Sequence, residues 1–203
     1  MTILFAARQR YTMLLAFSCF VAQGIISGML GVAWPSIRAT FGLSLDALVA
    51  LLIASTIGYV LGSFLASPLL ARIGVGWALL VTNLVSAAGF FGFVLAPSWA
   101  GLVAFGLLTG WGGGTTGTVL NIYVASTRTV RTMNWMHASF GVGATIGPLL
   151  MTAIVGAGAS WRLGYAIGAF IHLGLGLLFL TVVRTMRVKQ SHPSRAEDAS
   201  AHA

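Results

Sequence analysis

The chain has 203 residues, of which 58% are hydrophobic and only 7% are charged, a composition far outside that of soluble globular domains. Its net charge of +8 comes from eleven Lys and Arg against three acidic residues. These values predict a membrane protein with several spanning helices, and they exclude an ordinary soluble domain.

Six apolar stretches follow one another along the chain, each close to or above the roughly 20 residues that a helix needs to cross a bilayer. They cover about residues 11–34, 47–71, 77–95, 101–124, 133–155 and 162–183. Residues 1–10 form an N-terminus that we expect to be retained, because the first apolar run is longer than that of a signal peptide. The polar residues 184–203 predict a disordered tail. The predicted fold class is an all-α integral membrane protein with six transmembrane helices.

Positive charges are distributed unevenly between the two sides of these helices. One side carries only Arg38 and Arg162, and the other carries nine basic residues: Arg8, Arg10, Arg72, Arg128, Arg131, Arg184, Arg187, Lys189 and Arg195. Because loops rich in Lys and Arg stay in the cytoplasm, both termini are predicted to be cytoplasmic, in a plasma membrane. The basic balance then reflects topology and contact with lipid headgroups. Nucleic acid is not an expected partner, and self-association would be parallel.

Several polar and aromatic side chains are predicted near the middle of the spans. They are Gln23 and Ser27 in the first span, Tyr59 in the second, and Trp111, Thr115 and Asn121 in the fourth. An amide at this depth must find partners or face water, which favours a cavity role for Gln23. Hydroxyls often bond to their own helix, and Trp111 could stack on a flat solute or pack in the core. Asn121 could bond to Asn134 or help to close the cytoplasmic end.

His137 lies one turn inside the fifth span and is a candidate for proton coupling, because histidine changes its charge near neutral pH. His172 is the other histidine at such a depth. No Asp or Glu lies within a span, apart from Asp46 at an outer end, so a packing role for His137 stays the alternative.

The stretch 134–148 combines small residues with a proline in an apolar run. Gly143, Gly147 and Pro148 form a G-x-x-x-G-P pattern, in which the glycines leave a smooth face for another helix and the proline frees a carbonyl. This pattern predicts a packing and gating element.

Enzymatic, metal-binding and nucleotide-dependent roles lack the required residues. The spans hold no carboxylate pair and no Cys/His cluster, and Cys19 is the one cysteine. The glycine run 112–114 lies within a span, without a following Lys-Ser/Thr. We therefore expect no enzyme activity, cofactor or metal.

Three groups of motifs together resemble the major facilitator superfamily. Ser67–Gly74 is similar to its loop signature, keeping Leu69, Arg72 and Gly74, and Gly143-x-x-x-Gly147-Pro148 resembles its antiporter signature. The order of Leu120–Val124, Arg131–His137, Gly141–Pro148 and Ser160–Tyr165 is most similar to fucose-permease-like sugar and drug transporters. The resemblance covers about residues 10–185. Ala71, Val75 and Gly76 replace charged residues of the loop signature, and no arginine lies between Arg72 and Arg128.

The resemblance implies a fold, an arrangement and a function. Six helices would form a 3+3 inverted repeat, equal to the N-terminal half of a twelve-helix transporter, with the first and fourth helices lining a cavity and the second and fifth forming an interface. In that arrangement Gly143 and Gly147 would oppose a partner subunit. Two copies related by a two-fold axis would complete the transporter, so a parallel homodimer is predicted. A heterodimer or a fragment of a longer chain would have a similar sequence.

The predicted function is secondary active transport, by alternating access, of a small neutral or weakly charged organic solute such as a sugar or a heteroaromatic metabolite or drug. The spans offer amide, hydroxyl and aromatic groups but no buried counter-charge. The direction of transport stays open. The alternative is an accessory, non-transporting half that pairs with another transporter chain, and a channel is a third option.

Overall fold

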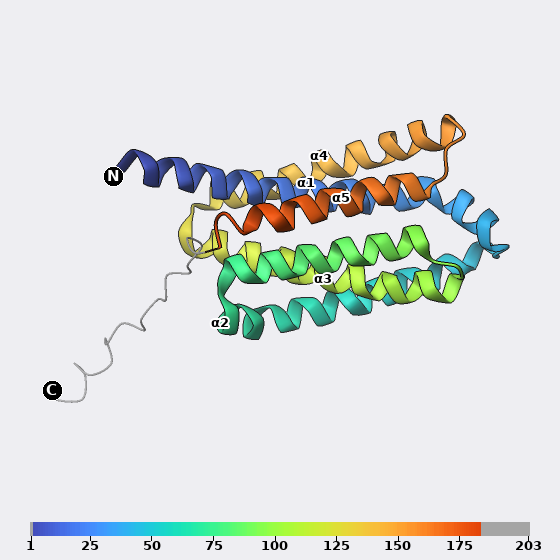
Figure 1. The fold of residues 1–203 in the computed structure, drawn as a ribbon, viewed down its shortest axis with the longest axis horizontal. Coiled ribbons are helices and arrows are strands. Elements are labelled where there is room, and N and C mark those ends of the chain that lie inside the picture. Colours follow the sequence, from blue (N-terminus) through green and yellow to red (C-terminus); the bar gives the residue numbers. More distant parts are fainter. Residues whose placement is uncertain (1, 184–203) are drawn as a thin grey trace.

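The computed structural model describes residues 2–183, with side chains from residue 10 onward. This part of the chain is helical and contains no strand. Its elements are α1 (Thr2–Phe41), the short 3₁₀-helix η1 (Leu45–Ala47), α2 (Leu48–Leu95), α3 (Trp99–Thr127), α4 (Val130–Gly156) and α5 (Arg162–Phe179). The helices lie roughly along one direction and form a single elongated bundle (Figure 1). The predicted tail 184–203 lies outside the described residues.

The second and third predicted spans form one element, α2, in place of two separate helices. The backbone leaves the helical region at Gly74, with φ 79° and ψ 166°, and the chain folds back there (Figure 1). We call residues 48–73 the first arm of α2 and residues 75–95 its second arm. The described residues thus form five continuous α-helical elements, and the two arms of α2 correspond to the second and third predicted spans.

Four stretches of the described residues are long and apolar enough to cross a membrane. They are Arg10–Phe41, Leu45–Leu95, Val130–Gly156 and Arg162–Phe179. α3 is not among them although it has 29 residues. Its glycine run and its threonines lower the mean hydropathy, so the predicted span 101–124 is not apolar enough by this criterion.

α1 extends seven residues beyond the predicted end of the first span, through Pro35 to Phe41. A proline removes one helical hydrogen bond, and the helix continues past it. Gly42, with φ 63°, ends the helix, and the Leu43 N–H donates to the carbonyl of Arg38 at 3.0 Å. This is the six-to-one bond of a glycine C-terminal motif. The predicted boundary at Trp34 is therefore wrong, because the glycine ends the helix and the proline does not.

Arg162 fastens the end of the bundle that carries the α4–α5 connection. Its guanidinium donates to the carbonyls of Phe93 at 3.2 Å, of Ala96 at 3.0 Å and of Val94. These carbonyls belong to the carboxyl end of α2, where the helix dipole favours a cation. The same guanidinium lies 4.8 Å from the ring centre of Trp161. Arg162 therefore ties the start of α5 to the end of α2.

Close glycine contacts join the helices in two pairs. Gly143 and Gly147 of α4 lie against the backbone of α1, where a Cβ would come within 2.1 Å of the Val21 carbonyl and 2.0 Å of the Ile25 carbonyl. Gly24 and Gly28 of α1 meet α4 in the same way, and the Pro148 ring packs on Gly28. These four glycines form two G-x-x-x-G patterns that face each other.

The first arm of α2 and α3 repeat this arrangement. A Cβ on Gly58 or Gly62 would lie 2.0 Å or 2.3 Å from the carbonyls of Leu107 and Trp111. A Cβ on Gly110 or Gly114 would lie 2.1 Å or 2.2 Å from those of Ser55 and Tyr59. The second arm of α2 packs against α5, where a Cβ on Gly176 would lie 3.1 Å from the Leu84 side chain. It also contacts α3, where a Cβ on Gly112 would lie 2.2 Å from the Ser86 hydroxyl. The bundle is thus built from α1 with α4, the first arm with α3, and the second arm with α5.

The placement of Gly143 and Gly147 opposite a partner subunit is wrong. Both glycines are buried against α1 of the same chain. The apolar residues that α4 exposes lie on other faces of the helix: Trp135, Phe140, Val142, Ile146 and Leu149.

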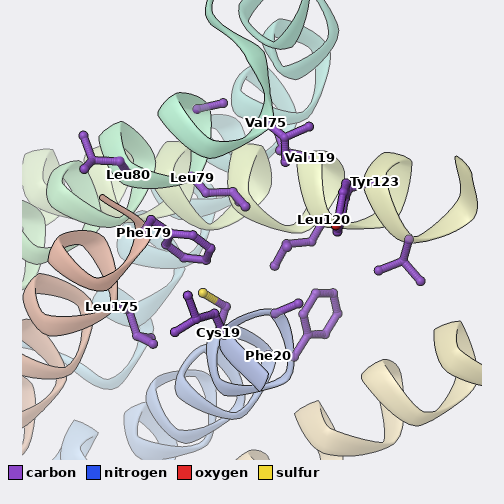
Figure 2. Close-up of a cluster of buried hydrophobic side chains, with 14 of the residues drawn as sticks. Cys19, Phe20, Val75, Leu79, Leu80, Val119, Leu120, Tyr123, Leu175 and Phe179 are labelled. Carbon is purple, nitrogen blue, oxygen red and sulfur yellow. The ribbon is translucent and has the colours of Figure 1, made fainter. Parts of the chain in front are cut away.

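Two apolar core clusters lie at different depths of the bundle. The first core cluster lies toward the Gly74 bend. It contains side chains from α1, α2, α3 and α5, such as Cys19, Leu79, Leu120 and Phe179 (Figure 2). The second lies toward Arg162 and includes Met29, Leu51, Phe90 and Tyr165. Between them lies a layer of buried polar side chains: Thr82, Asn83, Ser86, Thr115, Thr116 and His172. We call it the polar layer.

Candidate solute cavity

A cavity of about 610 Å³ lies at the depth of the polar layer. All five α-helices contribute to its wall, and the volume falls within the range of small-molecule sites. The lining polar and ring-bearing side chains are Phe20, Gln23, Ser27, Ser55, Thr56, Tyr59, Ser86, Phe90, Phe93, Thr109, Asn121, His137, Phe140, Tyr165 and His172. Three glycines of α3, Gly110, Gly113 and Gly117, complete one wall and leave it smooth.

Two amide groups of this wall are buried without a hydrogen-bond partner. They are Nε2 of Gln23 on α1 and Oδ1 of Asn121 on α3. A buried polar atom without a partner is rare in native proteins, because its desolvation is not offset. The Gln23 nitrogen is a donor and the Asn121 oxygen is an acceptor. A molecule in the cavity that carries both kinds of group could satisfy both.

Tyr59 and Gly117 lie beside Gln23. A Cβ on Gly117 would lie 3.9 Å from Oε1 of Gln23 and 4.0 Å from the Tyr59 hydroxyl. The absence of a side chain at Gly117 therefore leaves room between the amide and the phenol, and Asn121 follows Gly117 one turn later on α3. Tyr59 is 52% exposed and Ser27 is also exposed, so this side of the cavity is open.

The structure brings together four of the six predicted cavity residues: Gln23, Ser27, Tyr59 and Asn121. Trp111 and Thr115 do not line the cavity. The Thr115 hydroxyl donates to the carbonyls of Gly62 at 3.0 Å and Trp111 at 2.8 Å, and the Trp111 backbone packs on Gly62. This face of α3 meets the first arm of α2, whereas the face with Thr109, Gly113, Gly117 and Asn121 meets the cavity. Thr115 therefore faces the first arm of α2 and not the cavity. A cavity role for Trp111 stays a prediction.

His137 lies on the cavity wall and is exposed. Its ring contacts Phe20 edge to face, with centroids 5.3 Å apart. The proton-coupling role of His137 stays a prediction for a side chain on the cavity wall. Arg72 and Gly74, the loop-signature residues, lie far from the cavity at the bend of α2, where both are exposed.

One part of the wall, formed by α2 and α5, was not predicted from the sequence. Nδ1 of His172 lies 3.0 Å from Oδ1 of Asn83, and the Tyr165 hydroxyl is buried without a partner. Asn83 lies in the polar layer behind His172. An Asn in the third apolar run was the available signal, because a mid-span amide needs partners whichever helix carries it.

The chemistry of the cavity is that of hydrogen bonding and ring contact. No Asp, Glu, Lys or Arg is among the lining residues of the described chain. Within that same part of the chain, no group of three His, Cys, Asp or Glu side chains could hold a metal ion. The arrangement can bind an uncharged molecule and offers no nucleophile paired with a base.

Comparison with protein families gives a match over most of the chain. The family model described as Major Facilitator Superfamily matches residues 16–203. Among curated proteins no match was found.

Proposed function

The chain belongs to the major facilitator superfamily, whose members are membrane transporters and not enzymes, and on this premise we propose that it is a secondary active transporter of a small neutral or weakly charged organic solute. The observation that carries the proposal is the pair of unpartnered amide atoms, Gln23 Nε2 and Asn121 Oδ1, in the wall of a 610 Å³ cavity. A transporter needs polar groups at mid-membrane depth that its solute satisfies.

The chemistry of the wall supports an uncharged solute. A charged solute would leave water for a site without a counter-charge, which is costly at low dielectric. Amide, hydroxyl and ring groups suit a sugar or a heteroaromatic metabolite. The solute is therefore expected to carry both hydrogen-bond donors and acceptors around a ring.

Alternating access is the mechanism that the helix pairs support. α1 with α4 and the first arm of α2 with α3 form two units, each held by glycine contacts of the backbone. α3 and α4 make few contacts with each other, and the cavity lies between the two units. Rocking of one unit against the other would open the cavity to either side of the membrane while each pair stays packed.

A parallel homodimer is the assembly that we propose for this chain. The first arm of α2 exposes many large apolar side chains, among them Ile53, Ile57, Val60 and Phe64, and α4 exposes a second set. Both elements also contribute to the cavity wall. A second copy packed on these faces would close the open side of the cavity, so that each copy would complete the site of the other.

The charge pattern also supports a proposal for the orientation of the bundle in the membrane. α1 begins and α5 ends at the end of the bundle that carries the Gly74 bend and the α3–α4 connection (Figure 1). Arg10, Arg72, Arg128 and Arg131 lie toward this end, and Arg38 and Arg162 toward the other. The positive-inside rule then assigns the first end to the cytoplasm of a plasma membrane.

Reconstitution of the purified chain tests the transport proposal. Proteoliposomes are loaded with unlabelled glucose or uridine, and uptake of the tritiated compound is measured. Saturable uptake of at least one probe is expected, with a loss of about tenfold in both Gln23→Leu and Asn121→Leu. Thr118→Val, a similar polar-to-apolar change on α3 outside the cavity wall, should keep the uptake. Transport that is the same in all four proteins would contradict the proposed site.

The second candidate is an accessory half that pairs with another transporter chain. The exposed first arm of α2 and the exposed face of α4 would suit a different six-helix partner equally well. Flux that appears only when a second chain is co-reconstituted would favour this candidate over the homodimer.

A further inference from the structure

We infer that His172, held by Asn83, forms with Tyr165 a second recognition site in the cavity, which takes an O–H or N–H donor of an uncharged, ring-containing solute. The inference rests on the proposed function in that it names a further contact for the transported molecule. It is carried by residues that lie away from Gln23 and Asn121, on the second arm of α2 and on α5.

The orientation of Asn83 is the first step. Its Nδ2 donates to the carbonyl of Leu79, one turn earlier in α2, at 2.8 Å. A carbonyl can only accept, so the amide nitrogen must face Leu79 and the amide oxygen must face α5. The thiol of Cys19 lies 3.8 Å from this amide and adds only a weak contact.

The ring of His172 is held by this amide oxygen. Nδ1 of His172 lies 3.0 Å from Oδ1 of Asn83, and because that oxygen accepts, Nδ1 must carry the proton. In a neutral imidazole the other nitrogen, Nε2, is then an acceptor. No hydrogen bond to Nε2 is formed within residues 10–183. His172 is 2% exposed and lines the cavity, so this lone pair lacks a partner in the protein.

Tyr165 provides the second polar group. It lies two helical turns before His172, on the same face of α5, and is also 2% exposed. Its hydroxyl is buried without a partner and the residue lines the cavity. The Phe90 ring contacts both residues, with centroids 5.4 Å from His172 and 6.4 Å from Tyr165, the latter nearly parallel at 20°. Phe90 therefore offers a flat surface between an acceptor and a hydroxyl.

A purely structural role for the pair leaves these atoms unexplained. The bond between Asn83 and His172 does connect α2 to α5, and it needs only one of the two ring nitrogens. Two further polar atoms in the same wall are not used by this bond. His172 forms no hydrogen bond at Nε2 within residues 10–183, and the Tyr165 hydroxyl is buried without a partner. A solute ring packed on Phe90, with a hydroxyl or N–H directed at Nε2, would satisfy the acceptor and leave the Tyr165 hydroxyl for an acceptor of the solute.

The test follows isotope-labelled histidine side-chain nitrogens by NMR, in the purified full chain in detergent. The signals of His172 are assigned by comparison with His172→Phe and, independently, with His172→Gln. Nδ1 is expected to be protonated and Nε2 to be a free acceptor. Phenol and anisole then serve as probes, because they share a ring and differ in the donor. Phenol should shift the Nε2 signal saturably and bind at least about tenfold more tightly than anisole, the effect of one good hydrogen bond.

Two variants complete the experiment. Asn83→Leu should release the ring, so that the proton is no longer confined to Nδ1, and the preference for phenol should fall. Tyr165→Phe should keep the proton on Nδ1. Its affinity for phenol should fall less than that of Asn83→Leu. A proton on Nε2 in the unmodified chain, equal binding of the two probes, or no saturable shift with either would overturn the inference. Absence of transport with an intact phenol preference would refute the proposed function and leave this site standing.

Discussion

At the scale of single residues, the cavity is defined by polar atoms that the protein itself does not satisfy. Gln23 Nε2, Asn121 Oδ1 and the Tyr165 hydroxyl are all buried without a partner. Each such atom costs about 1–3 kcal/mol of stability when it is left unpaired. By contrast, Thr115, Thr116 and Asn83 in the same polar layer are all hydrogen-bonded within the chain. These three atoms lie in the cavity wall, where a ligand could replace the missing partners, whereas a further unpaired atom, Nε1 of Trp34, lies outside it.

His137 is the exposed histidine of the cavity wall, and we predict that it links transport to protons. Replacement by Ala should abolish the stimulation of tritiated glucose or uridine uptake by an inward proton gradient, because the wall holds no acidic side chain to take over. The measurement compares initial uptake rates in proteoliposomes with and without the gradient. Gradient-free uptake should change less than about twofold. Full stimulation in His137→Ala would contradict the coupling role.

The sequence indicates how deep each residue lies in a span, but not which way its side chain faces. The depth of Gln23, Ser27, Tyr59 and Asn121 could be read from their positions within apolar runs. The rotation of α3 could not, because polar and small residues lie all around this helix. Thr115 accordingly faces the first arm of α2, where its hydroxyl donates to the carbonyl of Gly62. Asn83, His172 and Tyr165 form their group across α2 and α5, and no local pattern connects residues so far apart.

At the scale of helices, backbone contact through glycine determines the packing. Gly24 and Gly28, Gly58 and Gly62, Gly110 and Gly114, and Gly143 and Gly147 all repeat the same spacing of four, and each pattern faces another. In the sequence only the last of these patterns is followed directly by a proline, which distinguishes it from the other three. Spacing alone would have indicated the other three, but their partners become visible only in the structure.

Gly147→Leu is predicted to separate α4 from α1. The new side chain would meet the carbonyl of Ile25 at the position where a Cβ already lies 2.0 Å from it, and backbone cannot move aside without unpacking the pair. The cost should be at least the about 1–3 kcal/mol typical of overpacking. It is measured as a lower midpoint of thermal unfolding in detergent. Gly141→Leu is the matched control on the same helix, since that position is exposed and no atom lies within 4 Å of its Cβ. An equal midpoint for both variants would contradict the pairing.

The bend of α2 depends on Gly74 in a different way. Its φ of 79° and ψ of 166° lie in a region that only glycine adopts readily, and open space surrounds the position of a Cβ. Gly74→Ala should therefore destabilise the fold by about 1–3 kcal/mol through backbone strain alone. Gly31→Ala is the control, because Gly31 has equally open surroundings inside α1 with an ordinary helical backbone. A lower unfolding midpoint is expected for Gly74→Ala only, and equal midpoints would exclude strain at the bend.

At the scale of the whole molecule, the three helix pairs can be related to one another by the proposed inverted repeat. If the first span corresponds to the fourth, the second to the fifth and the third to the sixth, the pair α1–α4 maps onto the pair formed by α3 and the first arm of α2. The pair formed by α5 and the second arm maps onto itself. The proposed 3+3 inverted repeat would require such pairs, and the repeat itself stays a proposal. The overall helical order could be predicted from hydropathy, whereas this pairing could not, because it depends on glycine faces of helices far apart in the chain.

The proposed parallel homodimer makes a prediction about depth. Ile53 on the first arm of α2 and Leu149 on α4 are both exposed and lie toward the same end of the bundle, whereas Trp135 lies toward the other end of α4. Leu149 follows Trp135 by fourteen positions, which correspond to about 21 Å along a helix. In a parallel dimer with the first arm of one copy against α4 of the other, Ile53 should therefore approach Leu149 and not Trp135.

Disulfide crosslinking between two differently tagged copies, each with one added cysteine, tests this geometry. Ile53→Cys is co-expressed with Leu149→Cys or with Trp135→Cys, and oxidised with copper phenanthroline in the membrane. Cys19 is buried and stays as an internal reference. Crosslinked dimer is expected for Ile53 with Leu149 and about tenfold less for Ile53 with Trp135. The reverse preference would indicate antiparallel packing, which the uneven charge distribution disfavours. Equal, low yields together with a monomeric native mass would refute the homodimer and favour a different partner on the exposed faces of α2 and α4.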